Sequence, residues 1–156
     1  MSWVQIPSGP SSNSAVRSFA VSMRKLTTRE FRRQEYNTKM EHELLEEIEK
    51  AKKYLIIVEG KKDLQSLKEI GFSKIFVINK TGKSLGEKIE EIRAIIGKEK
   101  VCILTDFDKK GKKLYLLLKS KLQEIGVKQD NTLRGFLLKE KISHIEGLSS
   151  YLNNKI

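Results

Sequence analysis

The stretch ILTDFDKKGKK, residues 103–113, ends an apolar run with two aspartates one residue apart and continues with four lysines around a glycine. A second stretch, YLIIVEGKK at residues 54–62, has a similar order: an apolar run, an acidic residue, a glycine and lysines. Continuous apolar runs are typical of strands that are covered on both faces. We therefore predict two buried strands, each followed by acidic residues at its carboxyl end.

Further strands and helices are indicated around these stretches. The segments LKEIGFSKIFVI, IRAIIGKEKVCIL and LQEIGVKQD each close a helical pattern with an apolar pair and a glycine and then begin a strand-like run. Glycine takes the left-handed conformation without steric cost, so Gly71, Gly97 and Gly126 are predicted helix caps. Strands are expected near 54–58, 74–78, 101–105 and 127–130. This alternation predicts an α/β fold, a compact Rossmann-like domain with about four parallel strands and helices on both faces.

The first 40 residues differ in composition from the rest of the chain. They contain both prolines, no sustained apolar period, and seven Lys or Arg against two Glu, which is typical of a disordered or arm-like segment. We expect the folded domain to span 41–156. It begins with an amphipathic helix whose apolar residues include Leu44, Leu45 and Ile48, and it ends in a short helical tail.

The start of the chain has a further interpretation. The segment WVQIP, residues 3–7, can be back-translated into a sequence that looks like the T-arm of a transfer-RNA gene read in frame. We therefore hypothesise that translation begins at Met23 or Met40 and that residues 1–22 come from a mis-called start. A genuine basic arm that binds nucleic acid is the alternative. A targeting peptide is disfavoured because the segment lacks a compact apolar region.

The overall charge favours polyanionic partners. The chain has 31 Lys and Arg against 20 Asp and Glu, a net charge of +11, and such a surface attracts nucleic acid or anionic membranes. No apolar stretch approaches the roughly 20 residues that a membrane span needs, so nucleic acid is the expected partner. Cys102 is the only cysteine, which excludes a disulfide framework and a cysteine-based zinc site and fits a reducing, cytoplasmic setting. Cys102 itself is predicted to be a core residue.

Glu59, Asp106 and Asp108 occupy positions that would be costly in a purely structural protein. Ligands of parallel α/β sheets collect at the carboxyl ends of the strands, and like charges held close together there repel. A divalent cation removes this repulsion, and Mg²⁺ prefers hard oxygen ligands. We therefore predict that these carboxylates hold Mg²⁺, or else Mn²⁺.

Lysines follow the acids at the expected starts of two helices. Helix N-termini expose backbone N–H groups and favour a phosphate group, although lysines there oppose the helix dipole. A solvated basic surface is the alternative for any single lysine. Lys80, in the loop after the second strand with Asn79, Thr81 and Gly82, is either a further phosphate contact or part of an ordinary loop. The predicted phosphate-binding residues are Gly60, Lys61, Lys62, Lys80, Lys109, Lys110, Lys112 and Lys113.

The pair LIIVEGKKD and ILTDFDKKGKK, in an alternating α/β frame, resembles the Toprim domain. This domain occurs in bacterial primases, topoisomerases, recombination-repair proteins and the nuclease that matures five-S ribosomal RNA, and small stand-alone archaeal Toprim proteins look most similar. The resemblance covers residues 54–151 and includes a tail of the type LR…IEGL, residues 133–148, which is similar to the tail of the maturation nuclease. It implies that Glu59 is the general acid or base and that Asp106 and Asp108 bind Mg²⁺.

A strand that ends in Asp-x-Asp also occurs in haloacid-dehalogenase-like phosphatases. Those enzymes have Thr or Val two residues after the second aspartate, where this chain has Lys110, and a strand that ends in Glu-Gly precedes the motif here. A phosphatase or a glycosyltransferase is therefore less favoured than a Toprim protein.

Two classes of function remain open. The first is a Mg²⁺-dependent nuclease or phosphotransferase that acts on RNA or DNA, with RNA processing slightly favoured. The second is a non-catalytic module that binds nucleic acid, on ribosomal RNA or as a subunit of a larger complex. Three acids facing a phosphate backbone favour the enzyme. His144 is interpreted as a surface residue rather than an acid or a ligand, and Arg134 equally as a phosphate contact or the partner of an acid on its helix.

Overall fold

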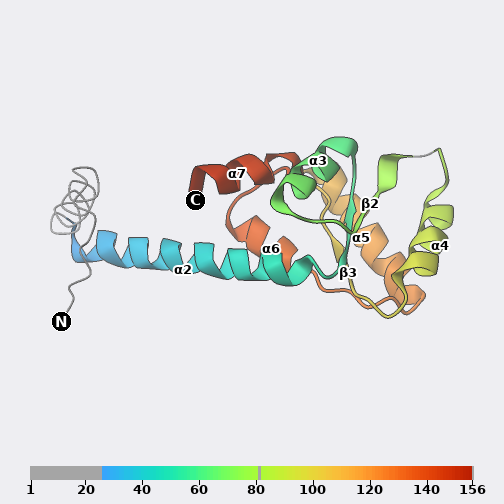
Figure 1. The fold of residues 1–156 in the computed structure, drawn as a ribbon, viewed down its shortest axis with the longest axis horizontal. Helices are drawn as coiled ribbons and strands as arrows, with labels where there is room; N and C mark the ends of the chain where they lie inside the picture. The colour runs from blue at the N-terminus through green and yellow to red at the C-terminus, as the bar shows by residue number, and fades with distance from the viewer. Residues whose placement is uncertain (1–25, 81, 156) are drawn as a thin grey trace, which may run out of the picture. The chain divides into compact units, whose positions relative to one another are not determined.

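The structure is a computed structural model in which residues 26–80 and 82–155 are described (Figure 1). The chain divides into two compact units, residues 1–42 and 43–156. Helix α2, Thr28–Ala51, begins in the first unit and continues into the second. Its start is capped reciprocally, because Thr27 Oγ1 accepts a hydrogen bond from the Glu30 N–H at 3.2 Å and Glu30 Oε2 accepts one from the Thr27 N–H at 2.8 Å.

Helix α2 crosses the boundary that composition predicts between residues 40 and 41. Residues 28–40 are helical, although composition predicts a disordered or arm-like segment, because the capping box at Thr27 supplies a helix start. Residues 1–25, which include both prolines and Met23, lie outside the described residues, so the extension and the mis-called start stay predictions. In the described ranges, neither α2 nor any shorter helix combines the length and apolar character needed to cross a membrane.

The second unit is built on a three-stranded parallel sheet with the order β2-β1-β3. Strand β1 is Leu55–Val58, β2 is Ile75–Val77 and β3 is Val101–Ile103. All four residues of the central strand β1 are buried, as its continuous apolar run predicts. The parallel sheet with helices around it confirms the α/β fold class.

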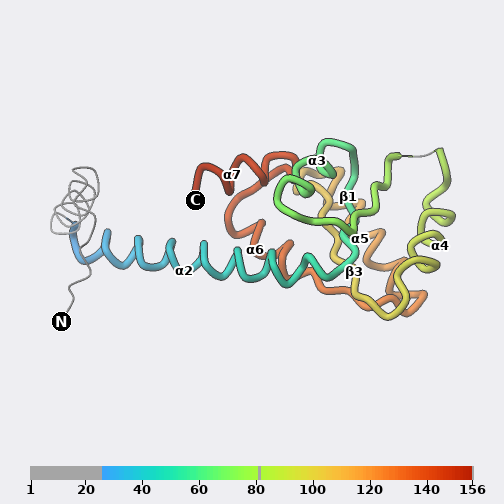
Figure 2. Tube along the Cα trace, in the orientation of Figure 1, coloured from blue at the N-terminus to red at the C-terminus, as the bar shows by residue number. Residues whose placement is uncertain are grey.

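Helices cover both faces of the sheet (Figures 1 and 2). Successive strand residues point to opposite faces, so the apolar strands contribute to a separate core on each side. Ile56 and Cys102 contribute to a core with the second-unit part of α2 and with α3 (Lys61–Ile70), α6 (Thr132–Lys139) and α7 (Leu148–Lys155). Ile57 and Ile103 contribute to a second core with α4 (Leu85–Ile96) and α5 (Lys109–Glu124). Two short 3-10 helices are η1 (Ile78–Lys80) and η2 (Ile145–Gly147).

Cys102 lies in the core, as its place in an apolar run predicts. Its side chain is fully buried, and burial raises the pKa of the thiol to about 12. The thiol is therefore a small apolar group of the core at any physiological pH.

The predicted fourth strand is reduced to a single parallel bridge between Gln129 and Val101. Pairing stops after this bridge because the Asn131 side chain, rather than a strand carbonyl, accepts the hydrogen bond of the Ile103 N–H at 3.0 Å. The Asp130 side chain bonds to the following helix: its Oδ1 accepts a hydrogen bond at 3.1 Å from the backbone N–H of Thr132, the first residue of α6. The Asp-Asn pair thus ends the strand pairing and starts α6 directly after the predicted strand at 127–130.

Three helices are followed by the glycine that the sequence predicts. Gly71 after α3, Gly97 after α4 and Gly126 after α5 have φ values of 106°, 57° and 76°. These values lie in the left-handed region, which glycine adopts without steric cost. The predicted helix ends are therefore confirmed.

Candidate metal and phosphate site

Glu59 and Asp106 meet at the carboxyl edge of the sheet. Glu59 directly follows β1, and Asp106 lies in the loop after β3, the neighbouring strand. The Glu59 Oε1 atom accepts a hydrogen bond from the Asp106 N–H at 3.0 Å. Parallel pairing of the two strands thus brings together two acids that are 47 residues apart in the chain.

The Glu59 carboxyl group lies in a partly buried and electronegative environment. Burial has the largest effect and raises the pKa of Glu59, and the charges of Asp106, Asp108 and Asp63 raise it further. The hydrogen bond from the Asp106 N–H acts in the opposite direction. Crowded carboxylates at a strand end are a suitable site for a divalent cation, because carboxylate oxygens are the ligands that Mg²⁺ prefers and the cation offsets their repulsion.

Asp108 forms the N-terminal cap of α5. Its Oδ1 accepts a hydrogen bond from the Gly111 N–H at 2.6 Å, and the second carboxylate oxygen remains for another ligand. The cap also holds Gly111 against the loop: a Cβ at this position would lie 2.1 Å from the Asp106 carbonyl oxygen and 2.9 Å from Glu59 Oε1. The close approach therefore requires glycine in the sequence Asp-x-Asp-x-x-Gly.

The segment Ser143–Ile145 forms one wall of the site. The Phe107 N–H donates a hydrogen bond to the Ser143 carbonyl at 3.0 Å, and the Ile145 N–H donates one to Asp106 Oδ1, also at 3.0 Å. These two bonds attach the C-terminal tail to the loop after β3. The family resemblance includes the tail, but the sequence does not show that its backbone binds a predicted metal ligand.

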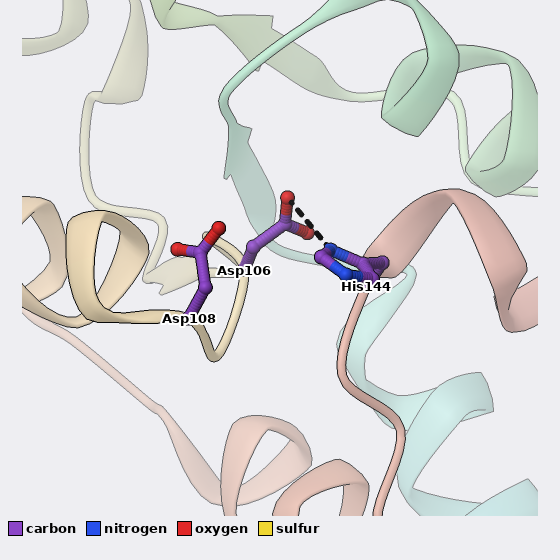
Figure 3. Close-up of side chains that lie close together, drawn as sticks. All are labelled: Asp106, Asp108 and His144. Carbon is purple, nitrogen blue, oxygen red and sulfur yellow. Dashed lines mark ion pairs between the residues drawn. The ribbon is translucent and has the colours of Figure 1, made fainter.

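His144 lies between these two bonds and faces Asp106 (Figure 3). Its Nδ1 is 3.4 Å from Asp106 Oδ2, and the ligand atoms of Asp106, Asp108 and His144 all lie within 4.8 Å of one another. The side chain is 50% exposed, in agreement with its interpretation as a surface residue, yet it belongs to the site. Sequence reasoning underrated it because a lone histidine beside an acid is common on protein surfaces.

Asp63 is an acid of the site that the sequence analysis did not single out. Its Oδ2 accepts a hydrogen bond from the Gly60 N–H at 3.0 Å, and the side chain is buried. Burial raises the pKa of Asp63 most, the bond from Gly60 lowers it, and the charges of Asp106 and Glu146 raise it. Its position three residues after Gly60 is that of a capping-box acid, and this spacing is the signal that would have found it.

Arg134 lies beneath the loop after β3 and is buried. Its Nη1 donates to the Thr105 carbonyl at 2.6 Å, and its Nη2 donates to the Asp106 carbonyl at 3.4 Å. The guanidinium carbon is 4.5 Å from the ring centre of Phe107 and 4.1 Å from that of Tyr115. This arrangement differs from both interpretations of the sequence, a phosphate contact and the partner of an acid on the same helix. The Arg134 side chain instead binds backbone carbonyls of the loop that carries the aspartates.

The predicted phosphate-binding lysines are all exposed. Lys61 and Lys62 are the first two residues of α3, which begins after Glu59 and Gly60. The first turns of α5, which begins directly after Asp108, contain Lys109, Lys110, Lys112 and Lys113. Lys80 ends η1, where the Asn79 N–H donates to the Glu59 carbonyl at 2.9 Å. Thr81, from the same loop, lies outside the described residues.

These lysines differ from others in the chain in their pairing. Several other lysines form ion pairs, among them Lys50, Lys52, Lys74, Lys83, Lys100 and Lys121. Among residues 26–80 and 82–155, no carboxylate pairs with a lysine of the predicted phosphate site. Their charge is therefore not neutralised by a carboxylate of the described chain, as an anion site requires.

Comparisons with known proteins agree with the motifs and the fold. The Toprim domain family matches residues 54–139. A UPF0292 protein of Methanocaldococcus jannaschii is 32% identical over 129 residues, which cover 80% of this chain and 98% of the relative. A UPF0292 protein of Methanosarcina barkeri is 36% identical over 102 residues, 64% of this chain and 69% of the relative.

A solved structure is also similar to this chain. A protein from Aquifex aeolicus superposes with a TM-score of 0.59 at 30% identity, and the match covers 67% of this chain and 94% of that protein. The matched residues 54–139 contain the acids Glu59, Asp106 and Asp108. The chain therefore belongs to the Toprim domain family and has archaeal UPF0292 proteins among its relatives.

Proposed function

We propose that this protein is a divalent-metal-dependent enzyme that cleaves or transfers phosphodiester bonds of nucleic acid, with RNA slightly favoured over DNA as the substrate. Membership of the Toprim family indicates a metal-dependent function related to nucleic acid. The observation that carries the proposal is the 3.0 Å hydrogen bond from the Asp106 N–H to Glu59 Oε1, because it places a carboxyl group with a raised pKa beside the candidate metal ligands. RNA is slightly favoured because the tail resembles that of an RNA-maturation nuclease.

The proposed roles follow from the positions of the side chains. Glu59, Asp106 and Asp108 would hold Mg²⁺ or Mn²⁺, and a cation bound there polarises the phosphate and stabilises the leaving oxygen. Glu59 is the proposed general acid or base, because its carboxyl group lies beside the aspartates and could exchange a proton with the reacting oxygen when it does not itself bind the cation. At Gly60 a Cβ would meet nothing within 4 Å, so the open space leaves the backbone accessible to a phosphate.

The starts of α3 and α5 supply the proposed phosphate contacts. Helix α3 begins after Glu59 and Gly60, and α5 begins directly after Asp108, so their first backbone N–H groups and positive dipole ends lie at the same edge of the sheet. The exposed lysines of these turns add unpaired positive charge. A nucleic-acid backbone is the polyanion that matches this combination of carboxylates inside a positive rim.

Recovery of bound nucleic acid tests the proposal. The protein is crosslinked in its host organism, the bound RNA or DNA is identified, and the same molecule is incubated with the purified protein and either Mg²⁺ or a chelator. We expect cleavage that requires the metal and is lost in the double variant Asp106→Asn with Asp108→Asn. Tight binding of the recovered molecule without metal-dependent cleavage would contradict the enzyme and support a non-catalytic module that acts alone or in a larger complex.

Metal binding is expected to stabilise the folded protein through Asp106 and Asp108. Selective binding to the folded state adds about 2.7 kcal/mol when the free metal is at 100 times its Kd. Asparagine keeps one acceptor oxygen for the Ile145 and Gly111 N–H groups but removes the charge, so the double variant should lose the metal response. Thermal unfolding with and without Mg²⁺ or Mn²⁺ measures this effect.

The matched control for the metal experiment is Glu90→Gln with Glu124→Gln. It removes the same charge from α4 and from the last residue of α5, at the opposite end of that helix from Asp108. The control should keep the full metal response. An unchanged response in the aspartate variant would place the metal elsewhere.

Nucleic-acid binding is expected to depend steeply on salt through the lysines of α5. Each lysine that neutralises a phosphate contributes about 0.9 to the slope of log affinity against log salt on duplex DNA and about 0.7 on single strands. Replacing Lys109, Lys110, Lys112 and Lys113 by Gln should therefore flatten the slope. Affinities measured by fluorescence anisotropy at several salt concentrations give the slope directly.

The control for the salt experiment removes the same charge from lysines that pair with carboxylates. The variant replaces Lys52, Lys74, Lys100 and Lys121 by Gln. It should change the slope much less, because these lysines are partly neutralised within the protein. Equal slopes for the two quadruple variants would show that binding depends on net charge and not on the proposed site.

A further inference from the structure

His144 is a nitrogen donor at a site that is otherwise composed of carboxylates. Its Nδ1 lies 3.4 Å from Asp106 Oδ2, and the ligand atoms of Asp106, Asp108 and His144 lie within 4.8 Å of one another. The residue stands outside the segment 54–139 that matches the Toprim family. Its proximity to the aspartates is therefore a property of this chain's tail rather than of the matched segment.

The backbone holds His144 in this position from both sides. The residue before it accepts a hydrogen bond from the Phe107 N–H, and the residue after it donates one to Asp106 Oδ1, each at 3.0 Å. The second bond engages Oδ1 and leaves Oδ2 as the Asp106 oxygen that faces the imidazole (Figure 3). These bonds fix the backbone at His144, so the ordering that cation binding requires is confined to the side chain.

The distances suit two ligands of one cation. Neighbouring ligands at right angles on a cation with bonds of about 2.1 Å are about 3 Å apart, and Nδ1 and Oδ2 are 3.4 Å apart without a cation. Asp108 contributes from the other side of the loop, where one of its oxygens is engaged by the Gly111 N–H. One oxygen from each aspartate and one imidazole nitrogen can therefore converge after small side-chain rotations.

We infer that His144 supplies a nitrogen ligand to the metal site and makes it prefer a first-row transition dication, such as Mn²⁺, over Mg²⁺. Mg²⁺ binds imidazole poorly because it prefers hard oxygen ligands, whereas Mn²⁺ accepts nitrogen as well as oxygen and lies in the series of metals that bind mixed sites more tightly. This inference rests on the proposed metal site and deepens it, since it assigns a metal class to the same aspartates.

The competing explanation is an ion pair. A protonated His144 would attract Asp106 at the observed distance without any metal ligation. In that case His144 and the cation compete for Asp106, so removal of the histidine would strengthen the binding of every divalent cation or leave it unchanged. The two explanations thus predict opposite effects on Mn²⁺ affinity.

Pulsed electron paramagnetic resonance of the Mn²⁺-loaded protein tests for direct ligation. The full chain without a histidine tag should show hyperfine coupling to ¹⁴N of the size that a bound imidazole gives. The coupling should vanish in His144→Gln and remain in His42→Gln, a matched control because His42 is the chain's other histidine. Absence of the coupling in the wild type, or its persistence in His144→Gln, would overturn the inference.

Calorimetric titration of Mn²⁺ and Mg²⁺ gives a second readout. We expect His144→Gln to weaken Mn²⁺ binding by about tenfold or more, since even the loss of an outer partner of a ligand costs about 10–100-fold, and to leave Mg²⁺ binding within about threefold of the wild type. Equal weakening of both metals, or tighter binding of both, would contradict the nitrogen ligand.

The titrations also separate this inference from the proposed function. If the wild type binds Mg²⁺ and Mn²⁺ through the aspartates but shows no nitrogen coupling, the inference fails and the proposed metal site stands. If the wild type binds neither metal, or if Asp106→Asn with Asp108→Asn leaves binding unchanged, the proposed metal site itself is wrong. None of these readouts depends on catalytic activity.

Discussion

Replacement of Glu59 by Gln is expected to lower the rate of metal-dependent cleavage by about 10²–10⁴, which is the usual contribution of a general acid or base. Glutamine keeps the shape of the side chain and an oxygen that accepts the hydrogen bond of the Asp106 N–H at 3.0 Å. It cannot exchange a proton. Affinity for nucleic acid should hardly fall and is expected to rise slightly, because one negative charge leaves the phosphate site.

The measurement is a pair of values on the same RNA and DNA substrates: the single-turnover cleavage rate with saturating metal, and the affinity without turnover. Glu124→Gln, which alters a glutamate at the far end of α5, should match the wild type in both. A cleavage rate for Glu59→Gln close to that of the wild type would remove Glu59 from the chemistry.

Loss of activity in Glu59→Gln is not expected to come from unfolding. Because burial raises the pKa of Glu59 in the folded state, the folded protein holds this proton more tightly than the unfolded chain does. The resulting stability is present below the ordinary pKa of glutamate and is lost as the pH rises through the raised pKa. At neutral pH without metal, the neutral glutamine should therefore leave the melting temperature unchanged or higher.

Replacement of Gly111 by Ala is expected to destabilise the protein by about 3 kcal/mol, at the upper end of the usual cost of overpacking. The new Cβ would lie 2.1 Å from the carbonyl oxygen of Asp106, 2.6 Å from its carbonyl carbon and 2.9 Å from Glu59 Oε1. The helix cannot move away freely. The Gly111 N–H is bound to Asp108 Oδ1 at 2.6 Å, and the Gly111 carbonyl accepts the Thr105 hydroxyl at 2.9 Å.

Gly135→Ala is the matched control for this substitution. Gly135 also lies within a helix, α6, but a Cβ there would meet nothing within 4 Å. Alanine should stabilise this helix by about 0.5–1 kcal/mol, because glycine loses more backbone entropy on folding. Urea denaturation measures both free energies of unfolding. Similar effects of the two substitutions would show that the close contact at Gly111 relaxes without cost.

Gly111→Ala is also expected to impair metal binding. Any shift of α5 that accommodates the new methyl group also displaces Asp108, the N-terminal cap of that helix, from Asp106. Gly111→Ala should therefore lose the stabilisation by metal as well, at a temperature where the variant is still folded. Gly135→Ala should keep it.

The sequence by itself determined the fold class and the candidate acids, because both depend on local patterns. A continuous apolar run predicts a strand that is buried on both faces, and β1 and β3 are such strands. Parallel neighbouring strands end at the same edge of the sheet, so acids that follow them, such as Glu59 and Asp106, had to approach each other. The glycines after α3, α4 and α5 ended helices for an equally local reason, their freedom to adopt positive φ.

Only the tertiary structure decided the surroundings of those acids. The bond from the Ile145 N–H to Asp106 joins residues 39 apart, and the bond from Arg134 to the Thr105 carbonyl joins residues 29 apart. A long-range contact also cuts the predicted fourth strand short, because the Asn131 side chain accepts the hydrogen bond of the Ile103 N–H, which lies 28 residues earlier in the chain. Periodicity reports which face of an element is apolar, but not which distant backbone group a lone polar side chain will reach. A histidine or an arginine has the same local pattern on an open surface as in a site, and only the packing of α6 and the tail against the sheet separates the two.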